Sequence, residues 1–185
     1  MCCGASSYGL SFIHDRKLFQ ELERMVEEDR RVHAESGEIS ILNEMHQSHA
    51  DRLKAIIAEH GWPGHALVGH EGNTYAWRIA QHATCDLEFQ RWVLMLIKDA
   101  VARRDAPMAH EAQLEDLIRI TEGRPQLYGT QLEIDADGLM SPLPIEDAAH
   151  VNDRRRAAGL GRLEKRVRVV RDEAALVGSG TRNSR

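Results

Sequence analysis

The stretch DLEFQRWVLMLIKDAVAR, residues 86–103, is the most apolar part of the sequence and decides the fold. Its large apolar side chains recur at the three- and four-residue spacing of one helix face. A helix that is apolar over so much of its surface belongs in the centre of a core. The longest unbroken apolar run, Trp92–Ile97, has six residues, whereas a helix that spans a bilayer needs roughly 20. The stretch therefore predicts a central core helix and excludes a membrane helix.

The rest of the chain adds helices on both sides of this one and a single hairpin. After Pro125, residues 126–134 alternate in the way of a half-buried strand, and residues 139–143 can pair with them across a turn. We therefore expect a mainly α single-domain helical bundle of about five to six helices with one two-stranded β-hairpin. The expected helices are 16–34, 42–60, 73–83, 86–103, 109–121 and a short 147–158, followed by a basic amphipathic stretch at 162–177. The expected organisation is a flexible N-terminus (1–15), a helical domain (16–160), and a basic C-terminal helix with a frayed tail (161–185).

The charge of the chain is unevenly distributed. The formal net charge is −5, yet residues 154–185 carry ten basic and three acidic side chains. Such a tail can touch an anionic partner, lie against its own acidic body or stay solvated. It contains no aromatic residue on which bases could stack, so nucleic acid is not an expected partner. Three cysteines cannot build a disulfide framework and the first 15 residues lack a secretory signal, so we expect a cytoplasmic protein.

Histidines at two places raise the question of a site. His60, His65 and His70 lie in a glycine-rich stretch at spacings of five, but zinc sites use tighter pairs, so we interpret this stretch as a turn. His82 lies at a junction between two apolar helices, where a carboxylate can set its tautomer and pKa. Asp86 and Asp116 are the candidate carboxylates, although Asp86 is also the natural N-cap of the next helix. The alternative is a core histidine bonded to a backbone carbonyl, with the nearby Cys85 as a buried structural thiol.

A third polar segment is Tyr128-Gly129-Thr130-Gln131. It either lines a polar pocket or packs as a hydroxyl-bearing strand on the helices. On strict alternation Tyr128 and Thr130 share one face, and Gln131 points the other way. Gly129 would let a ligand or another backbone approach closely.

Several motifs in a fixed order resemble the DUF6624 family of uncharacterised bacterial domains. They are Gly61-Trp62-Pro63, Ala76-Trp77, Gln81-His82-Ala83, Leu114-x-Asp116, Gln126-x-Tyr128-Gly129-Thr130-Gln131 and Arg154-Arg155. The resemblance covers roughly residues 18–163 and brings no established activity. It implies that His82, Asp116, Tyr128 and Gln131 belong to one pattern.

The leading functional hypothesis is a small enzyme for hydrolysis or proton transfer on a small polar or peptide substrate. His82 would be the general acid/base and Asp116 or Asp86 its orienting carboxylate. Binding of the substrate is assigned to Gln81, Trp77, Tyr128, Thr130 and Gln131. No phosphate-binding glycine loop is present, and no cofactor is expected. The alternatives are a non-catalytic ligand- or protein-binding module, and a hydrolase with a divalent metal at His82 and Asp86 or Asp116.

Overall fold

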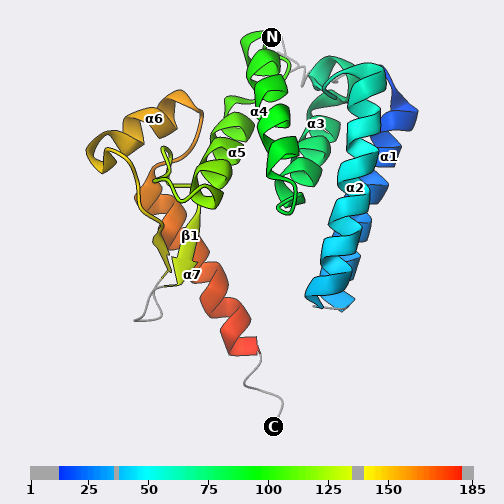
Figure 1. Ribbon diagram of the computed structural model, residues 1–185. Helices are drawn as coiled ribbons and strands as arrows, with labels where there is room; N and C mark the ends of the chain where they lie inside the picture. Colours follow the sequence, from blue (N-terminus) through cyan, green and yellow to red (C-terminus); the bar gives the residue numbers. More distant parts are fainter. Residues whose placement is uncertain (1–12, 36–37, 135–139, 181–185) are drawn as a thin grey trace, which may run out of the picture. The chain divides into compact units, whose positions relative to one another are not determined.

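The computed structural model describes residues 13–35, 38–134 and 140–180, with side chains through residue 172 (Figure 1). This part of the chain is mainly α-helical and contains one two-stranded antiparallel sheet, which confirms the expected fold class with seven α-helices in place of five to six. The elements are α1 (Arg16–Glu35), α2 (Ile39–His60), α3 (His65–His82), α4 (Leu87–Ala102), α5 (Met108–Thr121), β1 (Leu132–Ile134), β2 (Met140–Pro142), the 3-10 turn η1 (Ala148–His150), α6 (Val151–Ala157) and α7 (Leu163–Gly180). The chain divides between Cys85 and Asp86 into two compact units, called here the N-terminal unit and the C-terminal unit.

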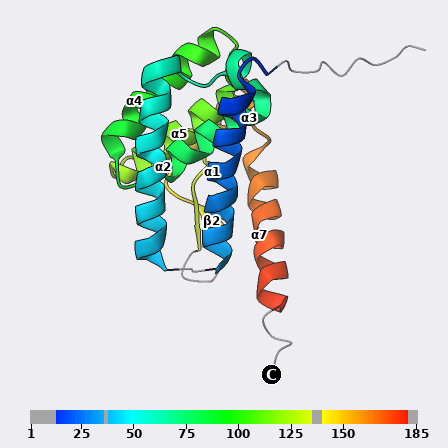
Figure 2. The same ribbon diagram turned by 90° about the vertical axis from the view of Figure 1, so that its right-hand side faces the viewer.

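The N-terminal unit is built from α1, α2 and α3, which pack against one another. Figure 2 shows α1 and α2 side by side. Each helix turns an apolar face inward, since its buried residues recur at helical spacing. The core of the unit contains Leu18, Leu22, Val26, Leu53, Ile56, Val68, Ala76 and Ile79, all buried.

Helix α3 begins eight residues earlier than the apolar pattern predicts. The sequence suggests a loop up to His70, but residues from His65 on are helical. The glycine content of this stretch reflects a break inside the helix, where Gly69 adopts φ 73° and ψ 177°. Asn73, fully buried, donates from Nδ2 to the carbonyl of Pro63 at 3.0 Å and so ties the helix to the loop before it.

The C-terminal unit is centred on α4 and α5, which pack on each other. Asp86 is the N-cap of α4, as expected, and its carboxylate accepts from the backbone N–H of Phe89 at 2.9 Å. The hairpin pairs Leu132 with Pro142 and lies beside α7 (Figure 1). Arg171 of α7 donates from Nε to the carbonyl of Met140 at 3.0 Å.

The first strand of the hairpin is shorter than the sequence predicts. Only Leu132–Ile134 pairs in the hairpin, Gln126 forms a single parallel bridge with Ile145, and residues 127–131 form a loop in which Gly129 has φ 66°. The N–H groups of Leu127, Tyr128, Thr130 and Gln131 bond to side chains of the unit, described below, and are therefore not available to a neighbouring strand. The expected turn at 135–138 and most of the two expected flexible ends lie outside the described residues.

Among the described helices, none combines the length and the apolar character that crossing a membrane requires.

Candidate metal centre

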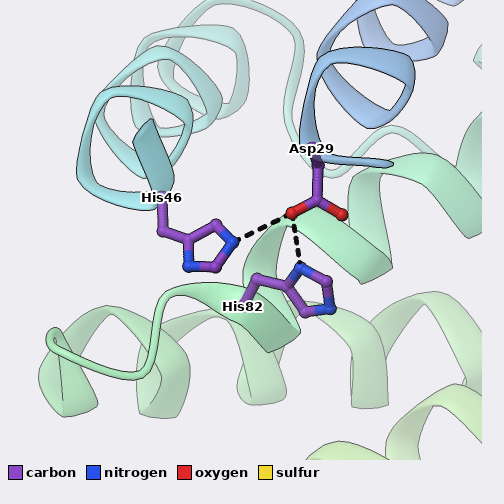
Figure 3. Close-up of side chains that lie close together, drawn as sticks. All are labelled: Asp29, His46 and His82. Atoms are coloured by element: carbon purple, nitrogen blue, oxygen red, sulfur yellow. Dashed lines mark hydrogen bonds and ion pairs between the residues drawn. The ribbon is translucent and has the colours of Figure 1, made fainter. Parts of the chain in front are cut away.

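His82 lies beside a carboxylate that the sequence did not suggest. The Nδ1 atom of His82 is 3.0 Å from Oδ1 of Asp29, and Nε2 of His46 is 2.9 Å from the same oxygen (Figure 3). One nitrogen or oxygen atom of each of the three residues lies within 4.8 Å of the other two. The residue that orients His82 in this structure is therefore Asp29, in place of Asp116 or Asp86.

The three side chains meet because three helices meet. Asp29 follows Met25 and Val26 on the inward face of α1 and is 4% exposed. His46 lies in the first half of α2, and His82 is the last residue of α3. Since α1, α2 and α3 all pack on one another, residues on their inward faces converge within the N-terminal unit.

Two further residues of α1 and α3 surround the carboxylate. His33 lies one turn after Asp29, and its Nδ1 atom is 2.8 Å from the main-chain oxygen of Asp29. Arg78 forms an ion pair from Nη2 to Oδ2 of Asp29 at 3.4 Å. Both Oδ2 of Asp29 and Nε of Arg78 are buried, and neither has a hydrogen-bond partner among the described residues. The site thus holds one acceptor and one donor that a bound species could satisfy.

The ionisation of the site follows from burial and from these contacts. Burial pushes the pKa of the Asp29 carboxyl upward, but the hydrogen bonds from His46 and His82 outweigh it and bring the pKa below its ordinary value. Burial lowers the pKa of His82 by more than the hydrogen bond to Asp29 raises it. At neutral pH Asp29 is therefore ionised and His82 is neutral. Because a carboxylate oxygen only accepts, each imidazole must present a ring N–H to it.

The space at the cluster is small. A cavity of about 10 Å³ is lined by Asp29, His46, His82, Arg78 and three neighbours, His49, Val26 and Ile79. That volume is close to the minimum for one water molecule. The cavity fits an ion or a water, whereas a substrate would have to reach the cluster from solvent, where the side chain of His82 is 27% exposed.

The donor atoms are those of a transition-metal site. Two imidazoles and one carboxylate are the ligand set of catalytic zinc and non-haem iron sites. Metal ligands must be deprotonated, and a His82 that is already neutral meets this requirement. A divalent cation would take the place of the two ring N–H groups that face Asp29, and each imidazole would then carry its proton on its other ring nitrogen.

Asp116, the first carboxylate that the sequence suggested, is engaged within the C-terminal unit. It is fully buried on α5 and accepts from the backbone N–H groups of Leu127 at 2.7 Å, Tyr128 at 3.0 Å and Thr130 at 3.0 Å. The hydroxyl of Thr130 also donates to it at 3.0 Å. Asp116 therefore holds the 127–130 loop, because a carboxylate at this position satisfies donors that have no strand partner.

The other residues of the sequence hypothesis fall into two groups. Trp77 and Gln81 are half-buried on α3, the helix of His82. Gln131 joins the loop network, since its amide donates to the hydroxyl of Thr130 at 3.1 Å and its N–H donates to Oε1 of buried Gln126 at 2.9 Å. Of the four residues that the resemblance groups together, Asp116, Tyr128 and Gln131 thus join one network within the C-terminal unit, whereas His82 bonds to Asp29 within the N-terminal unit.

Two smaller expectations are corrected. The side chain of Cys85 is exposed and its thiol bonds to Oε1 of Gln47 at 3.3 Å, whereas the sequence suggested burial. His65 and His70 lie in α3 with their ring centroids 3.8 Å apart. Among the described residues, the group with metal-binding geometry is Asp29, His46 and His82, and neither His65 nor His70 belongs to it.

Asp29, His46 and Arg78 were missed by sequence reasoning. A local signal existed for Asp29, which continues the apolar series Leu18, Leu22, Met25 and Val26 at helical spacing. An acid on the buried face of a helix is costly unless it is paired, so its place in the pattern points to a partner. His46 and Arg78 gave no comparable signal.

The fold and the cluster define a mainly helical protein with a two-histidine, one-aspartate site in which the aspartate is buried and the histidines are partly exposed. The chain belongs to DUF6624, a family of unknown function, whose model matches residues 17–178 and so crosses both units. Neither the curated proteins nor the solved structures contain a match to this chain.

Proposed function

We propose that the chain is a metal-dependent hydrolase whose metal ligands are Asp29, His46 and His82. The convergence of these three donor atoms within 4.8 Å, from three different helices, is the observation that carries the proposal. The substrate class stays that of a small polar or peptide molecule. The cytoplasm remains the proposed compartment, on the cysteine content alone.

The chemistry of the site fits this assignment. A bound divalent metal supplies Lewis acidity and lowers the pKa of a coordinated water into the neutral range. Asp29 would hold the cation through Oδ1, and the ion pair with Arg78 at Oδ2 would fix the orientation of the carboxylate. The buried Nε–H of Arg78, which has no hydrogen-bond partner among the described residues, would be a donor for an anionic oxygen at the site. His33, bonded to the main chain of Asp29, would help to hold this turn of α1 in place.

A metal-free acid/base site at His82 is the second candidate. The observation that favours it is Arg78, which already balances the charge of Asp29 without a metal ion. In that case Asp29 orients His82 as in a carboxylate–histidine pair, and His46 is a neighbour that shares the same carboxylate oxygen. The two candidates therefore differ in the role of His46, which is a metal ligand in the first and only a neighbour of the acid/base pair in the second.

The experiment is a metal and activity analysis of His46→Gln beside the unchanged protein. Purified protein is analysed for bound metals, titrated with Zn²⁺, Mn²⁺ and Fe²⁺, and tested for hydrolysis of a panel of nitrophenyl esters, phosphoesters and peptides. We expect one metal per chain, activity that a chelator removes and the metal restores, and a loss of metal affinity of more than about 100-fold in His46→Gln. His60→Gln is the matched control, because it is an exposed histidine on the same helix.

The outcomes separate the candidates. Hydrolysis that survives both the chelator and His46→Gln but is lost in His82→Gln would replace the metal centre with the acid/base site. Stoichiometric metal binding with no hydrolysis across the panel would mean that the chain is a metal-binding module and not a hydrolase. Absence of metal binding and of hydrolysis would overturn both.

A further inference from the structure

A second cavity lies entirely within the C-terminal unit. It measures about 510 Å³, within the range of small-molecule sites. Its lining combines polar groups from α5 and the 127–131 loop with the start of α7. The residues are Gln113, Thr130, Arg155, Leu160, Gly161, Arg162, Lys165, Arg166 and Val169.

One of the four cations in this lining is fixed by the fold. Arg155 is 3% exposed and donates from Nη1 to the carbonyl of Tyr128 at 2.7 Å and from Nε to that of Gly161 at 2.6 Å. Burial disfavours its positive charge, and the negative charge of Asp116 offsets part of that effect. Arg155 therefore shapes the wall and contributes little excess charge.

The other three cations leave an excess of positive charge. Arg162 pairs with Glu164 at 3.4 Å. Lys165 and Arg166 form no ion pair with any described residue. The cavity therefore carries roughly two uncompensated positive charges.

The position of Lys165 and Arg166 on α7 adds to the excess of positive charge at the cavity. The helix begins at Leu163, so Lys165 and Arg166 lie in its first turn. The N-terminus of a helix is electropositive and is stabilised by anions, so cations there are unfavourable by themselves. A bound anion would relieve the repulsion between the helix end and both side chains.

We infer that this cavity binds a small organic molecule through a phosphate monoester group. A phosphate monoester is close to a dianion at neutral pH and matches the two excess charges. The guanidinium fork of Arg166 suits a phosphate bidentately, and the amide of Gln113 offers a further donor. Leu160 and Val169 give the cavity an apolar wall, and its volume exceeds what a phosphate alone would fill, so the ligand has an organic body.

The test compares phenyl phosphate, inorganic phosphate and benzoate by calorimetry and thermal melting of the full chain, at constant ionic strength set with sodium chloride. We expect phenyl phosphate to bind most tightly, phosphate more weakly and benzoate weakest. In the double variant Lys165→Gln, Arg166→Gln, phenyl phosphate should bind at least about tenfold more weakly, since each charged hydrogen bond is worth a comparable factor. Arg168→Gln is the matched control for the single variant Arg166→Gln, because each removes one charge from the same helix and Arg168 is exposed and does not line this cavity.

Each other result overturns a part of the inference. Equal weakening in Arg166→Gln and in Arg168→Gln means diffuse attraction to a basic helix and no site. Equal affinity for benzoate and phenyl phosphate removes the phosphate assignment. No binding of any probe removes the site. If the double variant fails to fold, Gln113→Ala decides, because it removes one donor without a charge change and should still weaken phenyl phosphate several-fold.

Discussion

Replacing Asp116 with asparagine tests how the C-terminal unit is held together. The change keeps the size of the side chain and converts one carboxylate oxygen into an NH₂ donor. In the structure both oxygens of Asp116 accept, Oδ1 from the N–H groups of Leu127 and Tyr128 and Oδ2 from the N–H and hydroxyl of Thr130. Whichever way the amide is turned, its NH₂ group therefore faces a backbone N–H.

The expected cost is large because the site is fully buried. The least damaging orientation loses the N–H of Thr130 as a partner and replaces a charged acceptor with a neutral one for Leu127 and Tyr128. Hydrogen bonds to charged groups are worth about 1.5–3 kcal/mol, and a buried unsatisfied N–H costs a similar amount. The free energy of unfolding should fall by about 3 kcal/mol or more. For a chain of this size that lowers Tm by about 6–12 °C.

Thermal unfolding followed by circular dichroism measures the change. Asp153→Asn is the control, since Asp153 is exposed and its replacement is chemically identical. The metal affinity of folded Asp116→Asn should equal that of the unchanged protein, because Asp29 orients His82. A Tm within about 1 °C of the unchanged protein would refute the reasoning on the loop. Loss of metal binding by a folded variant would restore Asp116 as a partner of His82.

Two further predictions concern single positions. With a chelator present, the free energy of unfolding should fall as the pH drops below 6.5, the ordinary pKa of histidine. The reason is that the unfolded chain takes up a proton that folded His82, with its lowered pKa, does not. Denaturant titrations of His82→Gln should show a shallower fall of the free energy with pH, and the same fall as in the unchanged protein would contradict the lowered pKa. Gly129→Ala should destabilise the protein by more than Gly123→Ala, because both glycines have positive φ but only at Gly129 would the new Cβ lie 2.9 Å from the side chain of Leu163. Equal losses in urea unfolding would mean that only the backbone conformation matters.

Helices could be predicted from the sequence where each buries one regular face. The first and fourth helices were predicted at 16–34 and 86–103 and observed at Arg16–Glu35 and Leu87–Ala102. The start of α3 was missed because its glycines suggest a loop. In the structure only Gly69, with a positive φ, leaves the helical conformation, and the chain is helical on both sides of it. Alternation in residues 126–131 predicted a strand, but it cannot distinguish a strand from a loop whose N–H groups bond to buried side chains.

Only one member of the proposed metal-binding cluster, His82, could be predicted from the sequence. His82 stood out because a polar residue at a helix junction has few ordinary roles. Its partner Asp29 is 53 residues away in the sequence, and the partners of Asp29 include His46, 17 residues on. Pairings over such distances depend on how helices pack, which local periodicity does not encode. The burial of Asp29 on its helix was visible, but which group compensates it was not.

The 127–130 loop has a consequence for how this protein can change. Its N–H groups are held by Asp116, while Arg154 and Arg155 hold the carbonyls of Leu127 and Tyr128, each at 2.7 Å. Three charged residues outside the loop, Asp116, Arg154 and Arg155, thus hold its backbone in shape. The side chains of Leu127 and Tyr128 are half-buried and take no part in these hydrogen bonds, so they can be substituted while the contacts that hold the backbone are kept. A loop built in this way can acquire new specificity by substitution within it, whereas substitution of any of the three charged residues would dismantle it.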